Sequence, residues 1–180
     1  KKVIIIGAGP AGLFCADQLL GSGYDIDLYD HSSGVGKKFL IAGNGGLNLT
    51  HSEEIQRFSS RYGKNDKLFR SLLNGFSPDD LREWCHNLGV ETFVGTSGRV
   101  FPKGLKAAEI LLKWIARLKS HDSFNLYLNH RLISLNKDKE LIFKCGNDEI
   151  HAHCELVILA LGGASWKKTG SDGKWSSILK

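Results

Sequence analysis

The sequence predicts an α/β fold in which helices cover a parallel sheet and a small antiparallel β-meander is attached. Residues 3–6, "VIII", form a short β-branched run of the kind found in strands buried on both faces. The turn "GAGPAG" follows directly, then residues 13–23 with apolar side chains at helical spacing, and residues 25–30 alternate as a second strand does. Together these segments make a βαβ unit, whose crossover is expected to be right-handed.

Helices are expected in the middle of the chain. A helical segment is predicted around residues 67–73. Residues 77–89 predict the best-defined helix, because Ser77 can cap its start, Pro78 suits the first turn and Gly89 can end it.

Two further patterns follow. Residues 90–102 predict an extended pair around a Gly-Thr-Ser-Gly turn, and residues 104–120 predict an amphipathic helix. The expected apolar stripe of that helix consists of Ala108, Leu111, Leu112, Ile115 and Leu118.

The pattern then changes to the period of two that is typical of strands. Three short strands joined by polar turns predict the antiparallel meander. Residues 156–164, "LVILALGGA", predict another buried strand that ends in glycines, and residues 165–180 predict a glycine-broken loop that begins a helix. The three meander strands are expected at 125–137, 140–146 and 149–155.

Composition and charge indicate an ordinary globular protein. Of the 180 residues, 42% are hydrophobic and 24% are charged, and the net charge of +5 is spread along the chain among acids. A solvated basic surface is therefore expected rather than a nucleic-acid partner. No run approaches the length of a membrane span, and glycines interrupt the first apolar run too early for a signal peptide. A cytoplasmic location without membrane association is expected.

Cysteine and histidine patterns give no metal site. The cysteines form no C-x-x-C pair, and reduced thiols are the simplest interpretation. His151 and His153 share one face of a predicted strand, but exposed polar positions account for them better than a metal site does. A redox pair of Cys145 and Cys154 is equally unsupported. The four cysteines are Cys15, Cys85, Cys145 and Cys154.

The strongest functional signal is the motif Gly7-x-Gly9-x-x-Gly12, which directly follows a predicted buried strand and opens a helix. In this context it is the fingerprint of a Rossmann-like dinucleotide-binding domain. Gly7 permits the tight turn, Gly9 lets a pyrophosphate approach the backbone, and Gly12 lets helix and strand pack closely. With Pro10 and Ala11 between them, these residues are expected to bind a cofactor at the helix N-terminus.

Asp30 ends the second predicted strand, at the position where an acid accepts both ribose hydroxyls of an adenosine. An acid there also repels a 2′-phosphate, which argues against NADP at this site. The fingerprint alone does not separate NAD from FAD, and a tight turn without a ligand is the alternative to both.

Three separated blocks carry a family resemblance. They read "GKKFLIAGNGGLNLTHSE" at 36–53, "GRVFPKGLKAAEIL" at 98–111 and "LALGGASWKKTGSDGKW" at 159–175, and "GAGPAGL" precedes them. In this order they resemble the HI0933-like, BaiN-type flavoproteins over essentially the whole chain. The sequence most resembles a subfamily whose loop reads GGLNLTHSE, whereas more common family members have an Arg-Cys pair in place of Gly46-Leu47.

The resemblance implies FAD as the cofactor and extends the expected site. The neutral loop 43–50 is similar to the family segment that runs along the pyrophosphate and flavin. Lys37 and Lys38 are placed to offset phosphate charge, with simple solvation as the alternative. Leu132 resembles the residue that bonds adenine through its backbone. The remaining expected cofactor-binding residues are Gly43, Asn44, Gly45, Gly46, Asn48 and Thr50 in the loop, and Ala160, Leu161 and Gly162 after the last strand.

Leu161 departs from the family pattern, because it replaces a usual threonine and leaves only backbone contacts there. Arg99 and Lys103 could reach a substrate anion, although surface charge is the simpler interpretation. The resemblance also implies a longer protein. Residues 1–180 are expected to be one FAD-binding domain, the N-terminal portion of a flavoprotein whose second domain and C-terminal flavin-closing segment are absent. Weaker FAD retention follows from that expectation.

The expected function is an FAD-dependent oxidoreductase that takes hydride from NAD(P)H and acts on an unsaturated or oxo group of an unknown small molecule. No catalytic residue is assigned. An NAD-dependent dehydrogenase is an alternative, but it would need a Tyr-x-x-x-Lys or similar group, which this sequence lacks. A non-catalytic dinucleotide-binding module is another. A flavin-linked RNA-modifying role rests on the basic charge alone.

Overall fold

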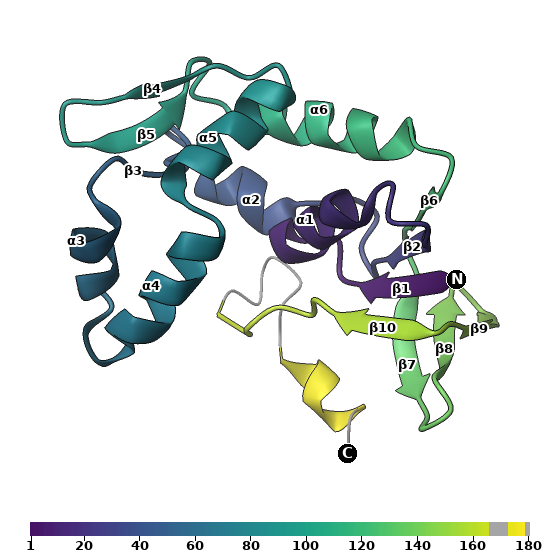
Figure 1. Cartoon of the computed structure of the whole chain (residues 1–180). Coiled ribbons are helices and arrows are strands. Elements are labelled where there is room, and N and C mark those ends of the chain that lie inside the picture. The colour runs from purple at the N-terminus through teal and green to yellow at the C-terminus, as the bar shows by residue number, and fades with distance from the viewer. Residues whose placement is uncertain (166–172, 179–180) are drawn as a thin grey trace. The chain divides into compact units, whose positions relative to one another are not determined.

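A computed structural model describes residues 1–165 and 173–178 (Figure 1), and the chain divides into two compact units. Unit 1 comprises Lys1–Ile41 and Ile115–Lys180, and unit 2 comprises Ala42–Trp114.

A parallel four-stranded sheet forms the centre of unit 1, which confirms the predicted α/β class. Its strand order is β10-β1-β2-β6, and β1 has 0% exposure at Val3, Ile4 and Ile5. These β-branched side chains fill both faces of the strand, as the run at 3–6 predicts. The strands are β1 (Lys2–Ile6), β2 (Asp25–Tyr29), β6 (Phe124–Tyr127) and β10 (Leu156–Leu159).

Helix α1 (Pro10–Leu19) connects β1 to β2 and completes the predicted βαβ unit (Figure 1). It begins where the sequence indicates, because Pro10 occupies its first turn and Gly9 is extended. Helix α2 (Lys37–Ala42) follows β2 and was not predicted; it ends directly before the glycines of loop 43–50.

The antiparallel meander is also present in unit 1, and it packs on the parallel sheet. Ile4 and Ile6 of β1 share a buried cluster with Leu141 and Phe143. The Tyr29 ring stacks on Phe143, with ring centroids 4.1 Å apart. The meander strands are β7 (Arg131–Leu135), β8 (Glu140–Cys145) and β9 (Asp148–His153).

Two predictions about strands are wrong in detail. The strand expected at 125–137 is two strands, because Asn129 has a φ of 59° and breaks the extended backbone. The first half, β6, joins the parallel sheet beside β2 and only the second half belongs to the meander. Strand β10 is not fully buried: Leu156 is 43% exposed, because β10 lies at an edge of the described sheet.

Unit 2 contains short helices and a three-stranded antiparallel sheet of order β3-β5-β4. The helix expected at 67–73 lies within α4 (Asp66–Gly75), and the helix expected at 77–89 is confirmed as α5 (Pro78–Asn87). The strands are β3 (Thr50–His51), β4 (Thr92–Val94) and β5 (Arg99–Pro102). The helices are α3 (Ile55–Ser60), the 3₁₀ turn η1 (Gly63–Asn65), α4 (Asp66–Gly75), α5 (Pro78–Asn87) and α6 (Ala107–Lys119), the last of which continues into unit 1.

The start of α5 shows the predicted cap. The Asp80 backbone N–H donates to Ser77 Oγ at 3.1 Å, and the Ser77 N–H donates to Asp80 Oδ2 at 2.7 Å. The Ser77 N–H and hydroxyl lower the pKa of the Asp80 carboxyl below its ordinary value, because both donate to its charged form.

The apolar stripe of α6 is rotated by one residue from the prediction. Leu112 is 73% exposed, so its expected place in the stripe is wrong. Trp114 is buried and packs edge to face on Trp84, with centroids 4.7 Å apart. This contact keeps Trp114 on the buried face of the helix. The buried side chains are Ala107, Ile110, Leu111, Trp114 and Leu118.

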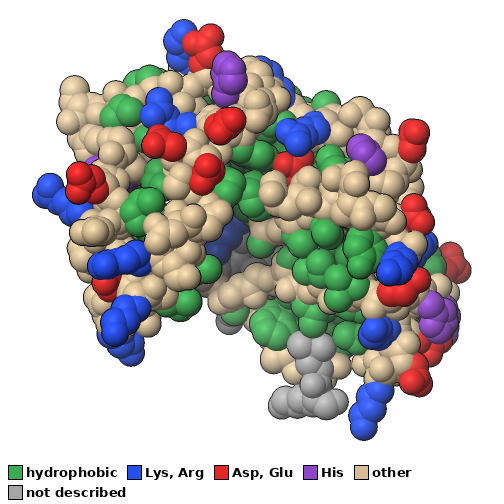
Figure 2. Space-filling view, viewed as in Figure 1, with side chains coloured by type: hydrophobic (Ala, Val, Ile, Leu, Met, Phe, Trp, Pro, Cys, Tyr) green, Lys and Arg blue, Asp and Glu red, His purple; other side chains and the backbone are tan. Residues whose placement is uncertain are grey.

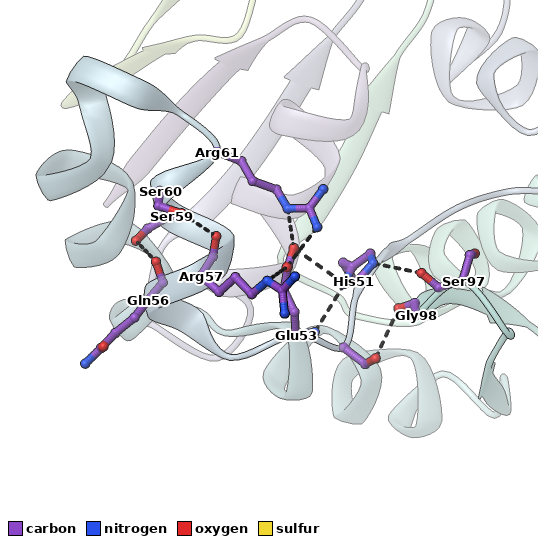
Figure 3. Close-up of polar contacts among 10 residues, drawn as sticks. His51, Glu53, Gln56, Arg57, Ser59, Ser60, Arg61, Ser97 and Gly98 are labelled. Carbon is purple, nitrogen blue, oxygen red and sulfur yellow. Dashed lines mark hydrogen bonds and ion pairs between the residues drawn. The ribbon is translucent and has the colours of Figure 1, made fainter.

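A polar network in unit 2 holds the chain just after loop 43–50 (Figure 3). The Glu53 carboxylate is 9% exposed and pairs with Arg61 through Nε at 2.6 Å and Nη2 at 2.9 Å. His51 Nδ1 accepts the Glu53 N–H at 3.2 Å, and the opposite ring nitrogen, Nε2, lies 3.0 Å from the Ser97 carbonyl oxygen. The neutral tautomer with hydrogen on Nε2 satisfies both contacts.

Candidate functional site

Unit 1 holds a cavity of about 690 Å³ at the carboxyl ends of its parallel strands. Its walls come from the turns after β1, β2 and β10, from the start of β7, and from the short 3₁₀ helix η3 (Lys174–Ser177). In open α/β sheets the carboxyl ends of the strands are where ligands bind. The cavity is therefore the candidate site.

The N-terminus of α1 opens into this cavity. Gly9, Pro10 and Ala11 line it, and the first backbone hydrogen bond of the helix runs from the Leu13 N–H to the Gly9 carbonyl. Among the described residues, the amides of Gly9, Ala11 and Gly12 have no acceptor. Free amides at the positive end of a helix form a binding site for a phosphate group.

The three motif glycines are required for different reasons. A Cβ on Gly12 would lie 1.9 Å from the Gly7 carbonyl oxygen, and one on Gly7 would lie 2.3 Å from the Ala160 carbonyl oxygen. A Cβ on Gly9 would meet nothing within 4 Å. Gly7 and Gly12 thus serve backbone packing, whereas Gly9 leaves room in the cavity wall that a pyrophosphate can fill. These residues fit a dinucleotide.

Asp30 lines the cavity but already has two backbone partners. Its Oδ2 accepts the Ala8 N–H and its Oδ1 accepts the Ser32 N–H, each at 2.7 Å. The expected pairing of this carboxylate with ribose hydroxyls therefore has to use the remaining lone pairs.

The cavity is strongly basic. Asp30 is the only acid among its described lining residues, and Lys37, Lys38, Arg131 and Lys174 supply positive charge. Lys38 Nζ donates to Ser165 Oγ at 2.5 Å. An anion such as a diphosphate suits this balance of charge.

Other predicted site residues from distant parts of unit 1 line the same cavity. Leu132 comes from β7, and Ala160, Leu161 and Gly162 follow β10. The Ala160 N–H donates to the Ile6 carbonyl at 2.8 Å, which fixes this segment beside the glycine turn. Their contacts with a cofactor stay predictions.

Sequence reasoning missed several lining residues. His31 follows Asp30 directly, so the motif itself could have indicated it. His130 and Trp175 line the cavity only because the fold brings their loops there. The Trp175 indole N–H donates to the Gly162 carbonyl at 3.1 Å.

Loop 43–50 belongs to unit 2 and does not line this cavity among the described residues. The second half of its backbone is held by two hydrogen bonds: the Leu47 N–H donates to the Leu105 carbonyl at 3.1 Å, and the Leu49 N–H to the Val100 carbonyl at 2.8 Å. The predicted flavin-binding role of the loop remains a prediction. The residues concerned are Gly43, Asn44, Gly45, Gly46, Asn48 and Thr50.

The other polar candidates have local partners. Lys103 pairs with Glu91, which lowers the pKa of that carboxyl. His151 Nδ1 lies 3.0 Å from Glu140 on the meander. No group of three or more His, Cys, Asp or Glu side chains within the described ranges is arranged to hold a metal ion.

Charges of both signs are interspersed on the face shown in Figure 2. None of the described helices is both long enough and apolar enough to cross a membrane.

Comparison with protein families matches the HI0933-like protein Rossmann domain over residues 1–180. The chain belongs to the HI0933-like family. The 3-dehydro-bile acid delta(4,6)-reductase of Clostridium scindens is 29% identical over 100% of this chain and 43% of its own length. The ribosomal RNA dihydrouridine synthase of Haemophilus influenzae is 25% identical over 93% of this chain and 42% of its own length. This HI0933-like chain thus spans less than half the length of these relatives.

Solved structures support the fold of this HI0933-like domain. The 3-ketosteroid-delta4-(5alpha)-dehydrogenase of Rhodococcus jostii RHA1 superposes with a TM-score of 0.64 at 14% identity. The match covers 89% of this chain and 45% of that one. At this identity the likeness concerns the fold alone.

Proposed function

We propose that this chain is the FAD-binding portion of an oxidoreductase that reduces a carbon–carbon double bond conjugated to a carbonyl group, with NAD(P)H as the hydride donor. The observation that carries the proposal is the open N-terminus of α1, where Gly9 leaves room in the wall of a basic cavity. A dinucleotide carries a diphosphate that such a cavity can bind.

The chain's own residues bind and orient the cofactor. The amides of Ala11 and Gly12 would donate to the diphosphate, and Lys37 and Arg131 would balance its charge. From the family resemblance alone, we also propose that amides of the neutral loop 43–50 would donate to the flavin ring without adding charge. When bound, FAD supplies the hydride chemistry, and the protein supplies position and electrostatics.

The substrate class comes from what two relatives' names share. A 3-dehydro-bile acid with delta(4,6) unsaturation and the uracil base from which dihydrouridine is made both contain a double bond conjugated to a carbonyl. Such a bond accepts hydride at its far carbon, because the carbonyl oxygen takes up the negative charge. The activity is proposed for the whole protein, since the chain corresponds to less than half of either relative.

Absorption spectroscopy tests the proposal. The whole protein, purified, supplied with FAD and desalted, is expected to keep the visible band of oxidised flavin and to lose it under nitrogen when NADH or NADPH is added. A conjugated enone should then restore the band, whereas a saturated ketone should not. Protein that retains no FAD, or bound FAD that neither nicotinamide bleaches, would contradict the proposal.

A base in RNA is the second candidate substrate, favoured by the dihydrouridine synthase relatives and by the net charge of +5. It predicts retention on an RNA column that falls steeply with salt. Reoxidation of the reduced protein by uridine-containing RNA but not by a steroid enone would favour this candidate. Binding of ADP-ribose without any retention of FAD would instead indicate a non-catalytic module.

A further inference from the structure

The Asp30 side chain lies where three loops of unit 1 meet. Its carboxylate accepts the N–H of Ala8, in the glycine turn, and the N–H of Ser32, in the loop after β2. Its backbone carbonyl accepts the N–H of His130, between β6 and β7, at 2.9 Å. Residues far apart in the sequence are thus fixed to one another by a single aspartate.

The bond to Ala8 bears directly on the helix N-terminus. Ala8 is 1% exposed, so water cannot easily replace the carboxylate as the acceptor of its N–H. The Ala8 carbonyl accepts the Gly36 N–H at 2.8 Å, so the residue is held on both sides. The orientation of this residue sets the direction of the Gly9–Gly12 backbone that follows.

We infer that Asp30 is a positioning residue: its carboxylate holds the glycine turn in the conformation that binds a diphosphate, before any ligand arrives. The inference rests on the dinucleotide site of the proposed function, but not on the reaction that follows. It differs from the usual assignment of this acid as an acceptor of ribose hydroxyls. Because both oxygens already have short bonds to backbone amides, their main contribution is made without a ribose.

The two roles are separated by varying the ligand together with the residue. Asp30→Asn keeps one acceptor oxygen but turns an NH₂ group toward one of the two amides, so one backbone donor loses its partner. A positioning role predicts that this variant lowers the affinity for ADP and for 2′,3′-dideoxy-ADP by the same factor, about tenfold. Isothermal titration calorimetry measures both ligands on both proteins. A loss confined to ADP would overturn the inference and restore the ribose assignment.

Asp25→Asn is the matched control, since Asp25 lies on the same strand and is exposed. It should leave both affinities unchanged. An NMR readout follows the proposed bonds themselves. In the ligand-free wild type, the amide protons of Ala8 and Ser32 should resonate far downfield because a carboxylate accepts them, and Asp30→Asn should move them upfield.

The wild type alone also tests the inference if Asp30→Asn does not fold. Ordinary positions of the Ala8 and Ser32 amide signals would overturn it, as would a large preference of the wild type for ADP over its dideoxy analogue. Wild-type protein that binds neither ADP nor pyrophosphate would refute the dinucleotide site, and the inference with it. Failure of the NMR or ribose comparison, with ADP still bound, would refute the inference alone.

Discussion

Substituting alanine at Gly9 and Gly12 separates ligand binding from folding. The two glycines open the same helix, yet they face different surroundings. A Cβ at Gly9 would meet nothing within 4 Å, whereas a Cβ at Gly12 would lie 1.9 Å from the Gly7 carbonyl oxygen. Gly9 also has an extended backbone with φ −78° and ψ −179°, which alanine adopts without strain.

The expected magnitudes differ accordingly. Gly9→Ala should leave the free energy of unfolding unchanged or raise it by up to about 1 kcal/mol, because alanine restricts the unfolded chain. Gly12→Ala forces backbone apart in a packed turn, and it should cost about 3 kcal/mol or more. For the cofactor the order reverses: a methyl at position 9 occupies the space of the pyrophosphate, so affinity for FAD should fall about a hundredfold, or about 2.7 kcal/mol.

Urea denaturation and calorimetric titration with FAD measure the two quantities on the same preparations. The reasoning predicts a stable Gly9→Ala protein that binds FAD weakly. It would be refuted by Gly9→Ala protein that binds FAD like the wild type, or by Gly12→Ala protein of wild-type stability. Either result would mean that the glycines do not have the separate roles assigned to them.

Three further predictions concern unit 2. Arg61→Ala should destabilise the protein in urea by about 2 kcal/mol, because it leaves the nearly buried Glu53 carboxylate without its best partner, and adding Glu53→Gln should recover part of the loss. Ser77→Ala should cost about 1 kcal/mol by removing the cap of α5. The pKa of Asp80 is lower in the folded protein than its ordinary value of 3.8, so the carboxylate stabilises the fold above pH 3.8 and loses this contribution as the pH falls through the folded pKa. The loss of unfolding free energy caused by Ser77→Ala should therefore shrink in acid, which urea denaturation at a series of pH values measures. Burial raises the pKa of the Cys85 thiol to about 11, so a disulfide reagent at about pH 8 should modify it only after unfolding; rapid modification of the native protein would contradict its burial.

Local patterns predicted the elements whose signals lie within a few residues. The run Val3–Ile6, the motif glycines and the Ser77 cap are such signals, and the structure confirms the strand, the turn and the helix start. The same approach failed at Asn129. The alternating pattern continues through this residue, but its positive φ ends the strand, and the segments before and after it join different sheets. The stripe of α6 was misplaced by one residue: its buried face includes Trp114, which packs on Trp84, a residue distant in sequence.

In the candidate site, too, features with local sequence signals were predicted, and contacts between residues distant in sequence were not. The glycine motif located the helix N-terminus, and family resemblance brought Leu132 and Ala160 into consideration, both of which line the cavity. The bond from Ala8 to Asp30 could not be foreseen, since it depends on the tertiary position of the β2 end. His130 reaches the cavity for a similar reason.

The central claim is that the N-terminus of α1 binds the diphosphate of FAD, and a crystal structure of the protein with FAD tests it most directly. The account predicts phosphate oxygens about 3 Å from the amide nitrogens of Ala11 and Gly12, against the open side of Gly9. A diphosphate bound elsewhere on the protein, with these amides facing solvent, would contradict it.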